Sequence, residues 1–142
     1  MTKIRDSLPW MLGCVVLLTT GCNQGDRDTT SVSGSVQYAN KPITVGEIRF
    51  VPTLGTKSST VGGQIHDGQF EIAAGQGLAV GEYRVEVLGY RPRNGSTGPV
   101  DLMDPEADYV QYVPVKHNKN SQEIVAVQST DSPLALDFAL PK

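Results

Sequence analysis

The strongest constraint on this fold is a two-residue alternation of apolar and polar side chains, which begins at Val32 and recurs in short runs to the end of the chain. The clearest run is 81–90. There Tyr83, Val85 and Val87 alternate with charged residues. Successive side chains of a β-strand point to opposite faces of a sheet, whereas a helix repeats every ~3.6 residues. The pattern therefore predicts half-buried strands, and no segment shows a helical stripe.

Turn-forming residues separate these runs, and the 142-residue chain holds 15 glycines and 9 prolines. Asp67-Gly68 lies between two extended runs and predicts a type I′ hairpin, in which both central residues need positive φ. The inward-facing set of the second run shifts at Gly46, which predicts a β-bulge. We expect strands at about 32–38, 43–51, 58–66, 69–73, 81–90, 122–128 and 134–140. Short strands joined by such turns predict an all-β, antiparallel, seven-stranded β-sandwich.

The first residues have the organisation of a secretory signal peptide. Lys3 and Arg5 precede an apolar run over 10–18, and small residues lead up to Cys22. This order of charge, apolar stretch and small residues is typical of an export signal that is later removed. The run is shorter than the ~20 residues that a membrane-spanning helix needs.

The segment Leu18-Thr19-Thr20-Gly21-Cys22 resembles the lipobox of bacterial lipoproteins. The resemblance implies cleavage before Cys22 and attachment of a diacylglyceryl group to its sulfur. The alternative is an ordinary signal peptide with an incidental cysteine. We expect a lipoprotein signal peptide over 1–21, a flexible tether over 22–31 that lacks apolar residues after Cys22, and a β-sandwich domain over 32–142.

Several short motifs of the domain resemble those of the carboxypeptidase regulatory-like domain, a transthyretin-like (prealbumin-like, Ig-like) sandwich. They are Val32-Ser33-Gly34-Ser35-Val36, Asn40-Lys41-Pro42-Ile43, Gly46-Glu47-Ile48-Arg49-Phe50-Val51-Pro52, Asp67-Gly68-Gln69-Phe70 and Gly81-Glu82-Tyr83-Arg84-Val85. The stretch Val113–Ser121 is similar to one in small lipoproteins of this type from planctomycete-like bacteria. The resemblance implies a fold and an exported location but no reaction. Transthyretin-like hydrolases end in Tyr-Arg-Gly-Ser, whereas this chain ends in Ala139-Leu140-Pro141-Lys142.

Residues for catalysis or metal binding are few. The histidines are His66 and His117, the cysteines Cys14 and Cys22 precede the domain, and no zinc-ligand spacing is present. We therefore expect no enzyme activity, no catalytic residue, no metal and no cofactor, with both histidines in solvated loops. The cluster Asp101, Asp104, Glu106 and Asp108 is predicted to be a solvated acidic loop, the alternative being a weak calcium site.

Three tyrosines border an irregular segment over 91–108. Tyr90, Tyr109 and Tyr112 are expected to pack this segment onto the sandwich edge, and the alternative is an aromatic patch that binds carbohydrate. A net charge of −3 gives no reason to expect a nucleic-acid partner or an anionic membrane surface as partner. The sequence thus predicts a non-catalytic, membrane-anchored envelope lipoprotein on the periplasmic or cell-surface side. Its contact surface for a protein or glycan would be an exposed sheet edge or residues 91–112.

Overall fold

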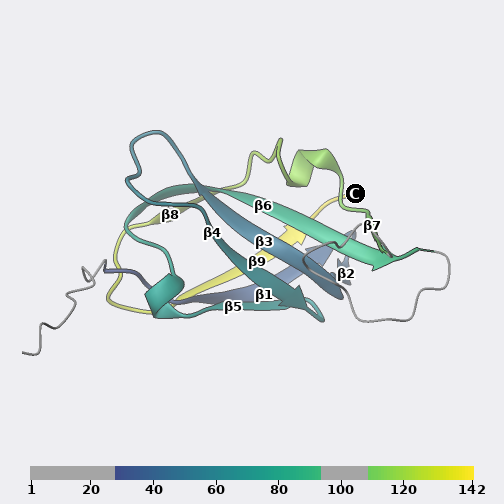
Figure 1. Ribbon diagram of the computed structural model, residues 1–142, viewed down its shortest axis with the longest axis horizontal. Coiled ribbons are helices and arrows are strands. Elements are labelled where there is room, and N and C mark those ends of the chain that lie inside the picture. Colours follow the sequence, from purple (N-terminus) through teal and green to yellow (C-terminus); the bar gives the residue numbers. More distant parts are fainter. Residues whose placement is uncertain (1–27, 94–108) are drawn as a thin grey trace, which may run out of the picture.

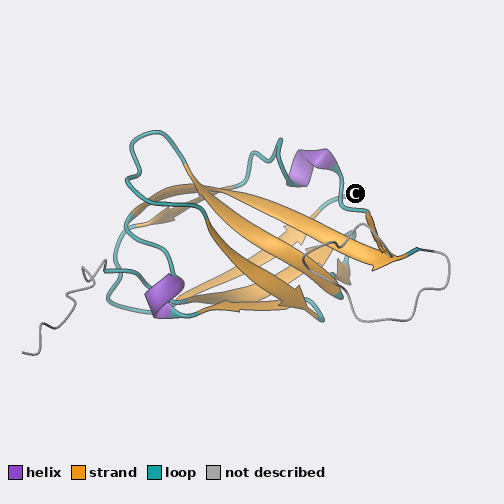
Figure 2. Cartoon of the chain, viewed as in Figure 1, coloured by secondary structure: helices purple, strands orange, loops and turns teal. Residues whose placement is uncertain are grey.

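The computed structural model describes residues 28–93 and 109–142. These residues form strands and two short 3₁₀ helices (Figures 1 and 2). The elements are β1 (Val32–Tyr38), β2 (Lys41–Pro42), β3 (Val45–Pro52), β4 (Val61–His66), β5 (Gln69–Ile72), η1 (Ala74–Gln76), β6 (Gly81–Pro92), β7 (Tyr109–Gln111), η2 (Val115–His117), β8 (Ile124–Val127) and β9 (Leu134–Leu140). None of the helices in the described part of the chain has the length and apolarity that crossing a bilayer requires. The prediction of an all-β domain is confirmed for the described residues, but the predicted count of seven strands is wrong, because the short strands β2 and β7 also join the sheet.

The strands form one curled sheet in the order β2-β1-β5-β4-β3-β6-β7, with β8 beside β6 and β9 beside β1. Figure 1 shows that β3, β4 and β6 lie in one layer, which we call the upper layer, and that β1, β5 and β9 lie opposite it in the lower layer. All pairs are antiparallel except β1–β9, which is parallel from Val32↔Leu134 to Tyr38↔Leu140. The expectation of a wholly antiparallel sheet is wrong for this pair, because alternation within a strand does not encode the direction of its neighbour.

The predicted bulge at Gly46 is absent. The ladders of β3 with β4 and with β6 run through Gly46 without skipping a residue. Ile43 is buried for a different reason, because it lies before β3 at the corner where the chain crosses between layers. Its backbone N–H donates to Val36 O (3.2 Å) and its carbonyl accepts from Gly68 N (2.8 Å). The inward-facing residues therefore change their spacing near Gly46 because the chain changes layer there.

The hairpin turn at Asp67-Gly68 is confirmed. Asp67 has φ 48° and Gly68 has φ 78°, as a type I′ turn requires. A second pair of positive-φ residues, Ala39 and Asn40, joins β1 to β2 through the pair Tyr38↔Lys41. Both turns match the right-handed twist of the strands that they connect.

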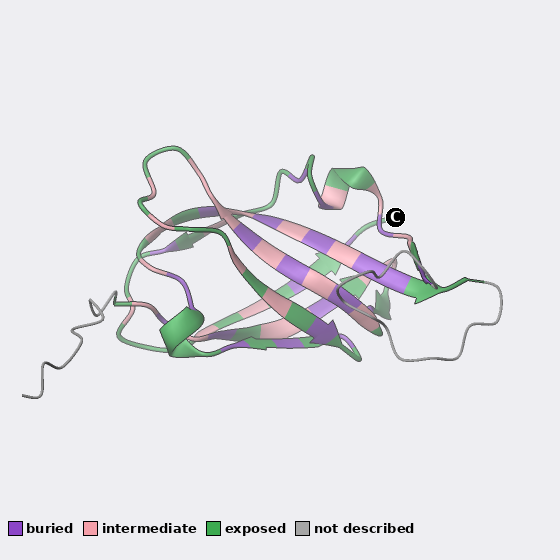
Figure 3. Cartoon of the chain, in the orientation of Figure 1, coloured by how far each residue is buried: buried purple, intermediate pink, exposed green. Residues whose placement is uncertain are grey.

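The core lies between the two layers, and the strands alternate between buried and more exposed residues (Figure 3). The chain has three phenylalanines, and all three meet in this core. Phe50 of β3, Phe70 of β5 and Phe138 of β9 have ring centroids 6.2–6.5 Å apart in tilted arrangements. Such tilted pairs add to the free energy gained by burying the rings. The other buried members are Val32, Val36, Ile43, Ile48, Ile65, Ile72, Leu78, Tyr83, Val85, Val87, Val113, Val127 and Leu140.

The ordered fold includes residues that we predicted to be tether. Thr30 is 2% exposed, and its backbone exchanges two hydrogen bonds with Leu78 (2.9 and 3.0 Å). Its hydroxyl donates to the carbonyl of Ser132 (2.5 Å). The polarity of this stretch suggested solvent exposure, but backbone pairing with Leu78 and the threonine hydroxyl bond satisfy its polar groups within the fold.

The polar segment 113–121, which we call the clamp, connects the edges of the two layers. Val113 is buried in the core, and η2 contacts β6 of the upper layer. Lys116 and His117 bond the carbonyls of Lys142 and Pro141, just beyond β9 of the lower layer (2.9 and 2.7 Å). The buried Asn118 side chain donates to Val113 O (3.2 Å) and accepts from Lys119 N (2.7 Å). The clamp therefore closes one side of the curled sheet.

We predict that Gly34→Ala lowers the free energy of unfolding by about 2–3 kcal/mol, as expected when atoms are forced into a packed site. A Cβ at Gly34 would lie 1.6 Å from the carbonyl oxygen of Leu136, so β9 would have to move. The control is Gly75→Ala, whose Cβ would meet nothing within 4 Å. Urea unfolding measures both. Equal midpoints for the two variants would contradict a close approach of β1 and β9.

We predict that Asn118→Ala costs about 1–3 kcal/mol, because it removes the acceptor for Lys119 N and a donor from a buried site. Asn120→Ala is the matched control in the same segment. Asn120 is exposed, so the expected change is within roughly 0.5 kcal/mol. Thermal unfolding of both variants tests the clamp, and a similar loss in both would argue against a special role for Asn118.

Candidate functional site

The three tyrosines singled out in the sequence do not form an exposed aromatic platform. Tyr90 and Tyr109 are 8% and 6% exposed, so their rings are largely withdrawn from solvent. Tyr112 is half-buried, with its ring centroid 6.0 Å from that of Tyr38 and the Arg91 guanidinium 5.9 Å from its centroid. Burial raises the pKa of the Tyr112 phenol. Packing describes Tyr90 and Tyr109 better than sugar stacking does, because stacking needs an exposed ring face.

The two histidines have separate partners. His66 Nε2 lies 3.1 Å from Gln64 Oε1 on the exposed face of β4. The ring of His117 bonds Pro141 O and lies 6.0 Å from the Tyr38 ring, so this residue belongs to the clamp. Over residues 28–93 and 109–142, no three His, Cys, Asp or Glu side chains gather as a metal site would require. Cys22 and the cluster Asp101, Asp104, Glu106 and Asp108 lie outside the described residues and stay predictions.

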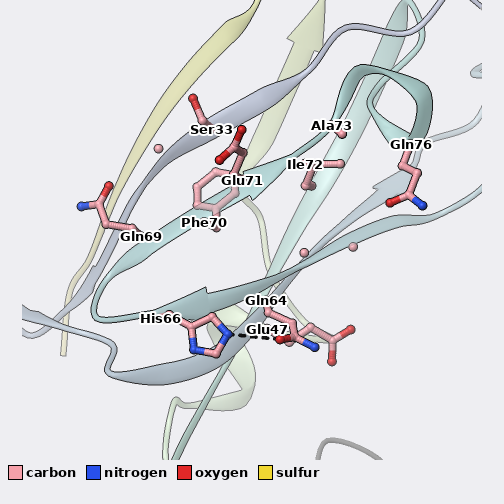
Figure 4. Close-up of a pocket in the computed structure, with 13 residues that line it drawn as sticks. Ser33, Glu47, Gln64, His66, Gln69, Phe70, Glu71, Ile72, Ala73 and Gln76 are labelled. Atoms are coloured by element: carbon pink, nitrogen blue, oxygen red, sulfur yellow. Dashed lines mark hydrogen bonds between the residues drawn. The ribbon is translucent and has the colours of Figure 1, made fainter.

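A groove opens on the side of the sheet opposite to the clamp, where β4 and β5 diverge. It has a volume of about 1090 Å³ and is open to solvent. Figure 4 shows Glu47, Gln64 and His66 along β3 and β4, with Ser33, Gln69 and Glu71 along β1 and β5. The complete lining is Ser33, Gly34, Glu47, Gly62, Gly63, Gln64, His66, Gln69, Phe70, Glu71, Ile72, Ala73 and Gln76. The sequence analysis did not identify this groove.

The groove exists because β4 and β5 pair only next to their turn. Their ladder consists of Ile65↔Phe70 and His66↔Gln69, after which β4 follows β3 and β5 follows β1. Among the described strands, none pairs with β4 over 61–64 on its β5 side. The two strands therefore face each other across the groove with incompletely paired edges.

The hydrogen-bonding direction of β4 shows which backbone groups face the groove. In an antiparallel ladder, alternate residues direct their N–H and C=O to the same neighbour. Asp67 N donates to Thr44 O on the β3 side (2.8 Å), so residues of odd number in β4 face β3. The even-numbered Gly62 and Gln64 then face the β5 side. Gly62 has no side chain on this edge, whereas the Ile72 side chain already lies against Gly63, where a Cβ would be 2.9 Å from Ile72 Cγ1.

The groove has the chemistry of a polar recognition site over an apolar base. Gln64, Gln69 and Gln76 supply amide donors and acceptors, and Glu71 supplies carboxylate oxygens. Phe70 and Ile72 line the groove while 4% and 3% exposed. Their burial places them at its base.

An ion pair orients the carboxylate of Glu47 at the groove. Glu47 receives two hydrogen bonds from Arg49 (2.7 and 2.8 Å), and this bonding raises the pKa of the guanidinium. The Glu47 side chain is about one-third exposed and that of Arg49 is 41% exposed. The pair therefore fixes a direction for the carboxylate more than it stabilises the fold.

Comparisons with known proteins give distant similarities. No protein-family model matches the chain, and no curated protein matches it. A solved candidate adhesin from Bacteroides ovatus is similar at 13% identity and a TM-score of 0.45, over 86% of this chain and 49% of that one. A 9R-lipoxygenase from Cyanothece is similar at 16% identity and a TM-score of 0.37, over 99% of this chain and 18% of that one. The chain thus spans about half of the first protein, and neither protein's activity transfers to it.

Proposed function

We propose that this chain is an exported, lipid-anchored, non-enzymatic binding domain of the bacterial cell envelope, and that its groove takes up an extended peptide. The observation that carries the proposal is the pair of incompletely paired edges of β4 and β5 that face each other across the groove. Such edges offer rows of N–H and C=O groups, which an extended chain satisfies by adding as a strand.

A peptide fits this groove better than a sugar does. Main-chain bonding needs N–H and C=O groups that face the groove, which Gly62 and Gln64 supply on the β5 side of β4. Glutamine amides and two carboxylates would then select the side chains of the bound strand, with a preference for basic residues near Glu71. Sugar binding commonly relies on exposed aromatic faces, and Tyr90 and Tyr109 are buried. Binding of a glycan in place of a peptide is therefore one of the results that the binding experiment below can give.

The motifs that resemble the carboxypeptidase regulatory-like domain have structural roles that favour membership of that transthyretin-like group. Gly34 of the first motif lies where β1 approaches β9, and Asp67-Gly68 forms the type I′ turn. Asn118 of the last motif bonds within the clamp. Members of this group are mostly accessory domains, which agrees with a binding role. The His66 imidazole is hydrogen-bonded to the Gln64 side-chain amide and not to a serine, threonine or cysteine, so this contact does not activate a nucleophile.

The lipid anchor is tested by the intact mass of protein extracted from membranes. We predict a chain that begins at Cys22 and carries acyl mass, because the segment before it resembles a lipobox. Cys22→Ser should lose the acyl mass and move to the soluble fraction. An unlipidated soluble protein in both cases would contradict the anchor and leave a secreted domain with an incidental cysteine.

Peptide binding is tested with a phage-displayed decapeptide library panned on the purified lipoprotein in detergent. We predict enrichment of peptides that bind as a strand. Gly62→Pro should abolish their binding because proline lacks the N–H that faces the groove, while Gly62→Ala keeps it. A Cβ at position 62 would make only ordinary contacts, the nearest at 3.4 Å, so the control should fold normally. Isothermal titration compares the three proteins.

A second measurement does not depend on the stability of the variants. N-methylation of alternate amides in the enriched peptide should abolish binding to the unmodified protein, because it removes the donors of an added strand. The absence of enriched peptides, or equal binding by Gly62→Pro with normal unfolding, would refute strand addition. Binding of soluble peptidoglycan fragments in their place would favour the carbohydrate alternative.

A further inference from the structure

The two ends of the curled sheet differ, and the N-terminal segment enters at one of them. The Thr29 hydroxyl bonds the carbonyl of Ala74, and Thr30 pairs with Leu78. These contacts attach the start of the fold to the β5–β6 connection. Figure 1 shows the loop from β3 to β4 at this same end, whereas β2 and the β4–β5 turn lie at the other. We call this end the tether end.

The β3–β4 loop begins with a fixed turn that displays a leucine. Thr56 N donates to Thr53 O (3.1 Å) around Gly55, whose φ is 99°, the geometry of a type II turn. Leu54 occupies the first central position and is fully exposed (105%). The turn thus keeps the whole apolar side chain of Leu54 in water, and its transfer to an apolar environment would be favourable.

Hydrogen bonds to β6 hold this turn in place. Thr53 N donates to Glu82 O (2.9 Å), and Glu82 N donates to the Thr56 hydroxyl (2.9 Å). A Cβ at Gly81 would lie 2.4 Å from the Thr56 methyl, so the turn rests directly on the start of β6. The residue before Gly81 is Val80, which is 57% exposed. Leu54 and the exposed Lys57 lie on this loop, and Val80 directly precedes the point where the loop rests on β6. We call these three residues the apical turn.

We infer that the apical turn docks on the surface of the lipid bilayer, an inference that rests on the proposed attachment of lipid to Cys22. A chain reaches at most about 3.3–3.6 Å per residue, so Thr29 lies within ~25 Å of the lipidated sulfur. This short connection turns the tether end toward the bilayer. Leucine and valine gain free energy by leaving water at a membrane surface. The exposed charges beside them, Lys57 and Glu82, are of opposite sign. Docking at this end directs the opposite end, with β2 and the β4–β5 turn, away from the membrane.

A unique tryptophan tests the inference. The chain has one tryptophan, Trp10, which the predicted cleavage removes, so Leu54→Trp would place one fluorophore at the apical turn. The matched control is Lys41→Trp, at an exposed position in β2 at the other end. Each lipidated protein is reconstituted into phosphatidylcholine–phosphatidylglycerol vesicles with and without brominated acyl chains. We expect a blue shift and loss of emission by bromine for Leu54→Trp, and neither change for Lys41→Trp.

Flotation of the vesicles separates the ways in which this inference could fail. If the proteins float with the vesicles but both tryptophans emit as in water, the anchor stands and docking is refuted. If Leu54→Trp shifts without bromine quenching and in proportion to protein density, the occupant is a second copy of the chain and docking on lipid is refuted. If the proteins do not float, the lipid anchor is wrong, and docking fails with it.

Discussion

The contact on which the fold depends is the meeting of Phe50, Phe70 and Phe138 between the two layers of the curled sheet. Each ring comes from a different strand, and the strands are far apart in sequence. All three phenylalanines of the chain are used in this contact. The parallel pairing of β9 with β1 places Phe138 where its ring meets those of Phe50 and Phe70. Gly34 allows that pairing by leaving room for the carbonyl of Leu136.

A sheet that curls over its core has two open sides, and in this chain one side is covered while the other is not. The clamp covers one side with buried polar groups that are bonded to one another, Asn118 above all, and with links to the end of the chain. On the other side, β4 and β5 are joined at their turn and then separate, which leaves the groove. Hydrogen bonds link the layers on the closed side, while on the open side part of β4 and β5 has no partner strand among the described residues. This asymmetry is the physical basis of the proposed peptide site.

The groove and the apical turn are positioned by the same strand, because β4 follows the β3–β4 loop directly. A domain that docks through Leu54 would hold the divergence of β4 and β5 along its side and the Asp67-Gly68 turn outward. The groove would then be reachable by an extended chain that approaches from the envelope space. Peptide binding through Gly62 can be tested apart from anchoring and docking, whereas docking through Leu54 depends on the anchor at Cys22.

The sequence alone determined seven of the nine described strands, the Asp67-Gly68 turn and the inward positions of Tyr83, Val85 and Val87, because these depend on local φ preferences and two-residue alternation. It missed β2 and β7, which are too short to show an alternation. It also predicted lipid attachment at Cys22, because this prediction depends on a short sequence motif and not on the folded structure. The tertiary structure decided the parallel partner of β1, the change of layer at Ile43 and the withdrawal of Tyr90 from solvent. The tertiary structure also produced the groove. The only local sign of it in the sequence is the pair of adjacent glycines, Gly62 and Gly63, in a strand with weak alternation. These features depend on which distant strands meet, and alternation specifies a buried face without naming the residues that will cover it.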